Sequence, residues 1–337
     1  MTLWLVIEWL IKSVVIFVII IGGFAYLTLL ERRTLARFQV RIGPNRAGPG
    51  GILQPLADAV KLIFKEELIP EKADKKLFII APVITVLPAL IILAVIPLGP
   101  QVELFGKVFD LSLASNISVG ALYILAVASI AVYGIIIAGW SSNNKYALMG
   151  GIRSSAQMIS YELSLGLAII GPIMLASSMS VNDIVTDQRQ LWYVVLQPIG
   201  FLIFFIASVA EVNRAPFDMP EAEQELTAGY HVEYSGMKFA LFFMAEYGKM
   251  IAVSLIAATL FLGSYWGPGV DQFPLLGPIY LAIKTLAVLF IMIWFRATLP
   301  RFRYDRLMGF GWKIMLPIAL LNVLITAVIV VLVGGLR

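Results

Sequence analysis

The feature that most constrains this fold is a series of apolar runs of about 20 residues, the length needed to cross a hydrocarbon core of about 30 Å. The runs lie at about residues 10–30, 78–98, 117–139, 156–178, 192–210, 239–262, 277–295 and 313–333. Apolar residues make up 60% of the 337 residues, so little sequence remains for a separate soluble domain. The sequence therefore predicts an all-α, polytopic membrane protein, with about eight transmembrane helices in a single membrane domain, residues 1–337.

The 25 Lys and Arg residues predict the orientation of these helices, because basic residues accumulate in cytoplasmic loops. Most of them fall in the loops after spans one, three, five and seven. The alternate side holds only Lys107, Arg189 and Arg337. We therefore expect both termini to lie outside. Lys12 and Lys284 fall within spans, and we expect their long side chains to extend toward the membrane surface.

Composition excludes several kinds of site. The chain has no cysteine, so it cannot hold a disulfide, a thiolate zinc site or a cysteine-ligated iron–sulfur cluster. His231 is the single histidine, which excludes a bis-histidine haem, and no metal site is expected. No glycine-rich dinucleotide or phosphate motif is present. The basic balance follows from membrane topology, and no basic patch with interleaved aromatics indicates nucleic-acid binding.

The first cytoplasmic loop, residues 31–77, contains a predicted amphipathic helix at about 52–66. Its polar stripe has helical spacing and consists of Gln54, Asp58, Lys61 and Lys65. Its opposite face is apolar and consists of Ile52, Leu56, Val60 and Ile63. We expect this helix to lie along the membrane surface. It is either a structural clamp against the bundle or one wall of a site that admits an amphiphile from the bilayer, and both roles can hold together.

Carboxylates gather around an acidic cytoplasmic loop, residues 211–238. If this segment is helical, Glu221 and Glu225 share a face and Glu223 points elsewhere. Pro216 and Phe217 indicate that the loop is packed rather than solvated. The candidate proton-handling acids lie in this loop or in the adjoining spans. A charged side chain within a span is energetically costly, so its presence there indicates a functional role. They are Glu162, Glu211, Asp218, Glu221, Glu223, Glu225 and Glu246.

Each of these acids also has a plain structural interpretation. Glu162 could pair with Arg153, and Glu246 with Lys249, three residues further along the same helix. Arg214 and Lys238 are the nearest counter-ions for the acidic loop. His231 is interpreted as a hydrogen-bonding residue near Glu233.

Four long segments carry a resemblance to a known family. They read RIGPNRAGP with LQPLADAVKLIFKE, GWSSNNKYALMGGIRSSAQMISYE, NRAPFDMPEAEQELTAGYHVEYSGMKF, and WFRATLPRFRYDRLM. Together they resemble the H-subunit family of bacterial NADH-quinone oxidoreductase, respiratory complex I, whose mitochondrial counterpart is subunit 1. The resemblance covers nearly the whole chain. Related membrane-bound hydrogenases carry a weaker version of the pattern.

The resemblance implies an eight-helix subunit of the inner membrane that forms the membrane end of a quinone chamber and begins a chain of buried acids. The implied chamber residues are Arg32, Arg41, Asp58, Lys61 and Arg296. NADH, FMN and iron–sulfur clusters would belong to partner subunits. Those partners would be soluble iron–sulfur and quinone-site subunits at the cytoplasmic face, and antiporter-like pumps within the membrane.

Ser129 departs from the family pattern. Many bacterial members have a glutamate just before the AVYG segment of span three, whereas this chain reads VASIAVYG. A serine is not a titrating group, so water or a neighbouring acid would have to carry the proton there.

Two other functions remain open from the sequence. A self-contained H⁺ or Na⁺ transporter could use the same acids, although no paired repeat or broken span is evident. An inert membrane anchor of a hydrogenase-like complex is the other.

Overall fold

The computed structural model describes residues 2–104, 107–109, 111–114, 117–218 and 229–334. Within these ranges the regular secondary structure is helical apart from a hairpin of two three-residue strands, β1 (Val102–Leu104) and β2 (Lys107–Phe109). Seven helices are long and apolar enough to cross a membrane. They are α1 (Thr2–Phe38), α3 (Lys75–Ile91), α4 (Gly120–Ser141), α5 (Lys145–Ala176), α10 (Gly236–Phe261), α11 (Leu276–Thr298) and α13 (Leu316–Gly334). The predicted all-α polytopic class is confirmed.

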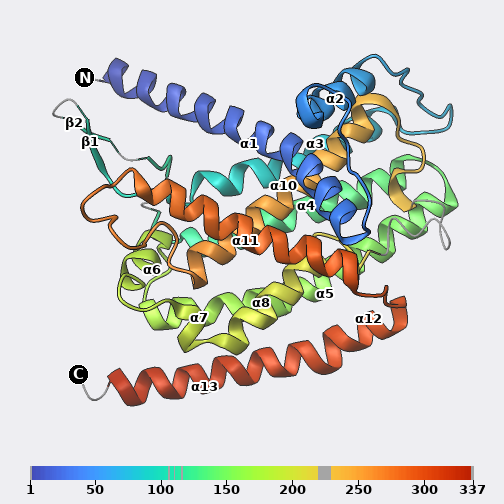
Figure 1. Ribbon diagram of the computed structural model, residues 1–337. Helices are drawn as coiled ribbons and strands as arrows, with labels where there is room; N and C mark the ends of the chain where they lie inside the picture. Colours follow the sequence, from blue (N-terminus) through green and yellow to red (C-terminus); the bar gives the residue numbers. More distant parts are fainter. Residues whose placement is uncertain (1, 105–106, 110, 115–116, 219–228, 335–337) are drawn as a thin grey trace.

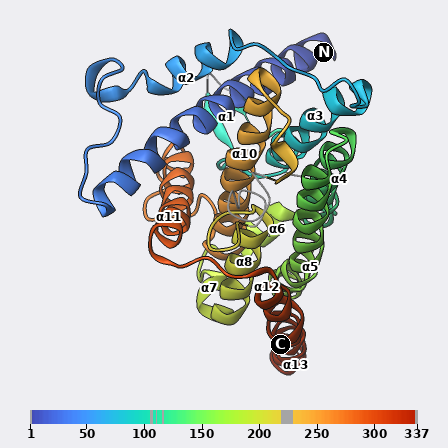
Figure 2. The same ribbon diagram turned by 90° about the vertical axis from the view of Figure 1, so that its right-hand side faces the viewer.

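The long helices form a bundle whose two outermost members are α1 and α13, at opposite edges in both views (Figures 1 and 2). Only 17% of the spanning window of either helix is buried, against 50% for α3, α5 and α10. The main core lies between these inner helices and α8 (Pro198–Glu211). The apolar sides of α1 and α13 thus remain available to lipid or to other subunits.

The fifth expected span is not one continuous helix of about 20 residues. It consists of the four-residue α7 (Tyr193–Leu196) and the 14-residue α8. Gln197 between them has a non-helical backbone, because a residue before a proline is disfavoured in the helical region and Pro198 follows. Gln197 is 4% exposed and donates from Nε2 to Thr326 Oγ1 at 2.8 Å. The break is therefore a packed feature that ties α8 to α13.

The amphipathic helix is α2 (Gln54–Ile63), slightly shorter than predicted. Its polar side faces α1, because Asp58 binds Arg32 there. Its apolar residues Leu56, Val60 and Ile63 are exposed. The helix therefore presents its apolar face outward, as a helix lying in a membrane surface does.

Short elements complete the chain. They are η1 (Pro49–Gly51), η2 (Ile92–Ala94), α6 (Val181–Asp187), η3 (Gly229–His231), α12 (Tyr304–Phe310) and a π-helical turn, η4 (Gly311–Met315).

Lys284 on α11 does not extend to the surface as expected. It is 9% exposed and donates from Nζ to the carbonyl oxygens of Ser264 at 2.8 Å and Trp266 at 2.7 Å. The ammonium also lies 4.5 Å from the ring centroid of Trp192. The amine is bound by carbonyl oxygens of the loop before α11 instead of by water. Lys284 therefore attaches this loop to α11.

Candidate functional site

A buried ion-pair cluster joins three helices near the start of the acidic loop. Arg214 Nη1 lies 3.0 Å from Oε1 of Glu31 on α1, and its Nε pairs with Glu246 on α10. Arg296, in the last turn of α11, pairs with the same Glu31 oxygen. Glu31 is 2% exposed and Arg214 is 6% exposed. Charges this deeply buried are stable only when they are paired, so the four side chains depend on one another.

Arg214 owes its position to the turn that follows α8. Asn213 has a left-handed backbone (φ 58), which asparagine tolerates better than most residues, and its side chain donates to Ser154 Oγ at 3.0 Å. Gln157 on α5 donates from Nε2 to the carbonyl oxygens of Ala210 and Phe217, both at 2.8 Å. The described part of the acidic loop is thus packed against α5, as its prolines and aromatics predicted.

The surroundings of Arg214 keep it charged. Burial opposes the charge of the guanidinium, but Glu246 and Glu31 outweigh burial and raise its pKa above the ordinary value. The Tyr247 ring centroid lies 4.4 Å from Arg214 Cζ and adds a cation–π contact. Tyr247 also interacts by hydrogen bonding with the side chains of both Arg214 and Glu31. The cluster is therefore a network of charged and polar groups.

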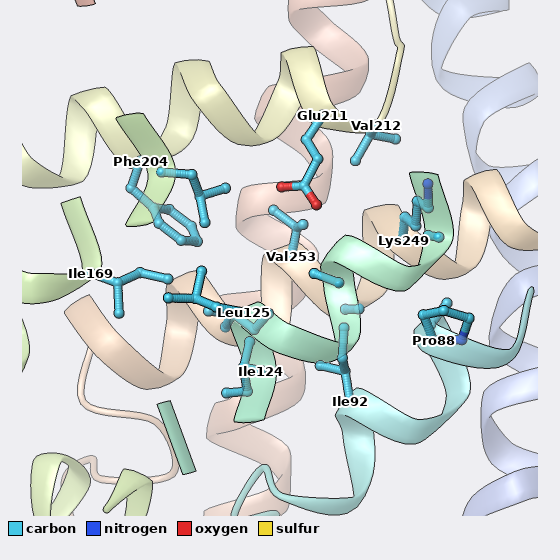
Figure 3. A pocket seen from close by; sticks show the side chains of 16 residues that line it. Pro88, Ile92, Ile124, Leu125, Ile169, Phe204, Glu211, Val212, Lys249 and Val253 are labelled. Carbon is cyan, nitrogen blue, oxygen red and sulfur yellow. The ribbon is translucent and has the colours of Figure 1, made fainter. Parts of the chain in front are cut away.

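A second group of charges lies deeper in the bundle. Glu211, at the end of α8, and Lys249, on α10, project into a small pocket that is otherwise apolar (Figure 3). The space that water can occupy there measures about 30 Å³, whereas about 10–15 Å³ suffices for one molecule. Lys249 also borders a neighbouring pocket of about 20 Å³ with Glu246 and Asn213. Lys249 thus lies between two spaces, each with an acid in its lining.

Electrostatic interactions link these acids. Lys249 interacts with both Glu211 and Glu246, and Glu211 interacts with Glu162 on α5. The expected proximity of Glu246 and Lys249 is therefore present, with Arg214 as a further partner of Glu246. Glu162, Glu211, Lys249 and Glu246 form a series from α5 to the Arg214 cluster.

Ser129 on α4 binds Glu162. Its Oγ is in hydrogen-bond contact with Glu162 Oε1 and with the carbonyl oxygen of Leu125, the latter at 3.0 Å. A hydroxyl has one proton, so it donates to only one of these acceptors at a time. With Glu162 ionised, the hydroxyl donates to the carboxylate. With Glu162 protonated, the carboxyl donates to Ser129, and the hydroxyl proton turns to Leu125. Ser129 can therefore follow the charge of Glu162 without titrating.

Arg153 was the alternative ion-pair partner expected for Glu162. Its guanidinium lies over the Tyr304 ring, with Cζ 5.7 Å from the ring centroid, in a cation–π contact.

Three of the five implied quinone-chamber residues meet between α1 and α2. Arg32 Nη1 lies 2.7 Å from Asp58 Oδ2, and Lys61 Nζ lies 3.9 Å from Asp58 Oδ1. Arg296 joins the buried cluster through Glu31, the neighbour of Arg32 in sequence. Arg41 is exposed and donates from Nε to Gln39 Oε1 at 2.7 Å, apart from the others.

An apolar groove of about 480 Å³ runs between α1, α10 and α11. Leu30, one residue from Glu31, is among its lining residues, and so are Ile251 on α10 and Leu286 on α11. The groove therefore extends along the bundle from the immediate neighbourhood of the buried cluster.

The remaining candidates lie at the edge of the described structure. Asp218 Oδ1 is 3.7 Å from Arg301 Nη2. Glu221, Glu223 and Glu225 lie outside the described residues. The 8% exposed His231 packs against the Tyr230 ring, and burial lowers its pKa to about 4. Glu233 accepts a hydrogen bond from Asn144 Nδ2 at 2.6 Å. Within the described ranges, no three His, Cys, Asp or Glu residues form a group that could hold a metal.

Glu31 is the residue that the sequence interpretation missed. It is an acid directly before two arginines at the end of an apolar run, which is typical of the solvated start of a loop. The sequence signal that could have identified Glu31 is that it directly continues the first apolar span, so a helix that extends past the span keeps Glu31 within the bundle.

Known proteins resemble the chain over almost its entire length. A family model described as NADH dehydrogenase matches residues 11–327. One of the H subunits of NADH-quinone oxidoreductase in Geobacter metallireducens is 52% identical over 330 residues, covering 95% of this chain and 94% of the relative. The corresponding H subunits of Thermomicrobium roseum and Protochlamydia amoebophila are 50% and 51% identical. The former alignment covers 92% of both chains, and the latter covers 90% of this chain and 91% of the relative.

Proposed function

Because the chain belongs to the H-subunit family of NADH-quinone oxidoreductase, a membrane component of complex I, we propose that it forms the membrane side of a quinone chamber and transmits quinone reduction to buried acids. The chamber residues are Arg32, Arg41, Asp58, Lys61 and Arg296. The relay acids are Glu162, Glu211, Asp218, Glu221, Glu223, Glu225 and Glu246. The chain itself carries no redox centre.

One observation carries this proposal: Arg296 and Glu246 belong to the same buried cluster through Glu31 and Arg214. Arg296 is a chamber candidate, and Glu246 is a relay candidate. A change of charge near Arg296 or Glu31 alters the field at Arg214, and therefore at Glu246, because buried charges are poorly screened. The cluster supplies a physical link between the two functions that the sequence assigned separately.

The quinone-facing side has suitable chemistry. A quinone needs a few hydrogen-bond donors for its carbonyl oxygens and a long apolar wall for its tail. The guanidinium groups of Arg214 and Arg296 would be the donors, and the groove between α1, α10 and α11 would be the wall. The outward apolar face of α2 supports entry of an amphiphile beside Arg32 and Asp58. When bound, quinone supplies two-electron redox chemistry that consumes protons.

The proton side follows the series of charges. Lys249 lines one small pocket with Glu211 and the other with Glu246, and it interacts electrostatically with both acids. Water in these pockets can carry protons between groups too far apart for direct contact. At the far end, Ser129 binds Glu162 in either charge state. In this chain, Ser129 therefore stands where many family members have a glutamate, and its hydroxyl can rotate between Glu162 and the Leu125 carbonyl.

We propose partners and a location that agree with the family. NADH, FMN and the iron–sulfur chain would belong to soluble subunits at the cytoplasmic face, and this chain has no cysteine that could hold an iron–sulfur cluster itself. Neighbouring membrane subunits, including antiporter-like pumps, receive the coupling. The subunit lies in the inner membrane with both termini outside. Neither a stand-alone transporter nor a hydrogenase-type anchor is favoured, because the similar proteins are named as subunits of NADH-quinone oxidoreductase.

The test uses the assembled enzyme in liposomes. Glu211→Gln and Glu246→Gln each keep the side-chain shape and remove the titrating proton. Each is expected to reduce quinone-linked NADH oxidation and proton pumping roughly tenfold, since a positioned proton-transfer group contributes about 10²–10⁴-fold and water can bypass part of the loss. Asp271→Asn is the matched control, because Asp271 is exposed and pairs only with exposed Arg189 among the described residues. Near-normal oxidation and pumping in both variants, at normal subunit content, would refute the relay.

A further inference from the structure

A second apolar cavity shares no lining residue with the groove, the Arg214 cluster or the Glu211 pocket. It measures about 420 Å³ and lies between α8, the end of α11, α12 and the π-helical turn η4. Its walls include Phe205, Val209, Phe295, Leu307 and Ile314. Arg306 is the one charged residue among its described lining residues. The proposed quinone and proton functions use none of these side chains.

The walls are held in place by contacts between lining residues and by one contact from α5. Phe302 donates its backbone N–H to the Pro216 carbonyl at 3.2 Å, and its ring stacks on Phe217 with centroids 5.8 Å apart. Tyr161 on α5 donates its hydroxyl to the Leu307 carbonyl at 2.9 Å, which fixes α12. The cavity is therefore pre-formed, and a ligand does not have to open it.

The charge at the rim is positive. Arg306 is exposed, and it has no ion pair within the described ranges. Asp305, the acid beside it, pairs instead with Arg303 at 3.2 Å. The segment between α11 and α13 belongs to the basic side of the protein, where anionic lipid headgroups attract arginine and lysine.

The structure points to an anionic phospholipid in this cavity: we propose that one acyl chain fills the space and the phosphate binds Arg306. An apolar cavity with a single cation at its edge fits a ligand with an apolar chain and one anionic end. A free anion would leave the cavity unused. A neutral amphiphile would leave Arg306 unused. The lining of this cavity contains none of the residues proposed for the quinone chamber.

The experiment uses the full enzyme in nanodiscs that contain a trace of phosphatidylglycerol with a photoreactive acyl chain. Phosphatidylcholine with the same chain is the headgroup control. After illumination, peptides from α8, α11, α12 and η4 are examined by mass spectrometry. Arg306→Gln removes the cation, and Ile206→Trp fills the cavity without removing any charge. Arg303→Gln, on the same segment but not in the lining, is the matched control.

Phosphatidylglycerol is expected to label the cavity peptides about fivefold more than phosphatidylcholine, because one arginine near a surface contributes about that factor. Arg306→Gln should remove this preference, Ile206→Trp should lower labelling by both lipids, and Arg303→Gln should change labelling less than twofold. Equal labelling by the two lipids in the native enzyme would overturn the proposal. So would an unchanged preference in Arg306→Gln, or cross-links from the cavity peptides to a neighbouring protein in place of lipid.

Discussion

The Arg214 cluster and the Glu211 pocket are both charged and buried, yet they are built differently. In the cluster, Arg214 is ion-paired directly with Glu31 and Glu246, and Arg296 is ion-paired with Glu31. In the pocket, Glu211 and Lys249 face a small space lined mainly by apolar side chains (Figure 3). Direct pairing fixes geometry and transmits a change of field. Acids and bases separated by room for water can exchange protons. In the proposed function, the cluster would transmit a change of charge and the pocket would move protons, and Glu246, which belongs to the cluster and borders a small pocket with Lys249, would connect the two.

The largest effect is expected from breaking the cluster. Arg214→Gln leaves two carboxylates buried without their shared partner and should destabilise the subunit by about 3–5 kcal/mol. The loss is measured as thermal unfolding of the purified complex, together with the subunit content of membranes.

The double variant Arg214→Gln with Glu246→Gln sharpens this test. It should be less destabilised than the sum of the single changes, because neutralising Glu246 removes one unpaired charge. Arg303→Gln, whose ion pair is on the surface, should alter stability by less than about 1 kcal/mol. An additive double variant would show that the cluster does not act as a unit.

Lys249 tests the pocket. Lys249→Met keeps the length of the side chain and removes the charge between Glu211 and Glu246. Because coupling between sites is typically about 1–3 kcal/mol, proton pumping should fall roughly tenfold while the complex still assembles. Lys249→Arg preserves the charge and serves as the control. If Met and Arg behave alike in a proton-uptake assay, charge at this position is irrelevant to coupling.

His231 makes the stability of the adjoining region depend on pH. Its pKa is lowered from 6.5 to about 4 by burial, so between these values the unfolded chain binds a proton that the folded chain does not. Stability therefore falls as pH decreases through this window, by about 1.4 kcal/mol between pH 7.5 and 5.5. Unfolding midpoints measured across this range in wild type and His231→Gln isolate the effect. The variant should lack this part of the acid sensitivity, and an identical pH dependence in both proteins would contradict it.

The smallest effect is expected at Ser129. Ser129→Ala removes the hydroxyl that binds Glu162 in both charge states and should slow coupled turnover about three- to fivefold, in line with the roughly 1 kcal/mol of a typical hydrogen bond. Ser129→Thr keeps the hydroxyl and should remain close to wild type. Turnover is measured over a range of pH, since loss of the turning hydroxyl should alter the profile as well as the rate. A Thr variant as slow as the Ala variant would indicate a packing defect.

The sequence predicted most of the transmembrane helices because each is a long apolar run, and length and hydropathy are local properties. It also indicated Glu162, Glu211 and Glu246 as candidates, because an acid within or beside such a run is conspicuous. It could not predict that Arg214 reaches Glu31, which is 183 residues distant in sequence. That pairing depends on how α1 packs against the turn after α8, and no local pattern encodes it.

Two other differences have the same origin. The sequence did not predict the break at Gln197, because the residues around it form a continuous apolar run. Pro198 was the available indication, since proline disfavours a helical backbone at the residue before it. Lys284 was expected in water because lysine usually reaches it, and the apolar run gave no sign that the connection before α11 folds back to supply carbonyl partners 18 and 20 residues away. Tertiary contacts decided both cases.

The way α2 is attached to α1 has a mechanical consequence. Asp58 on α2 forms an ion pair with Arg32 on α1. The apolar face of α2 is exposed on the outside, as in a helix that lies at the boundary between lipid headgroups and acyl chains. A shift of α2 within the membrane surface would act first on Arg32, through this salt bridge, and Arg32 directly follows Glu31 in the chain. A change in the lipid around α2 would therefore act on the residue next to the most deeply buried carboxylate of the cluster.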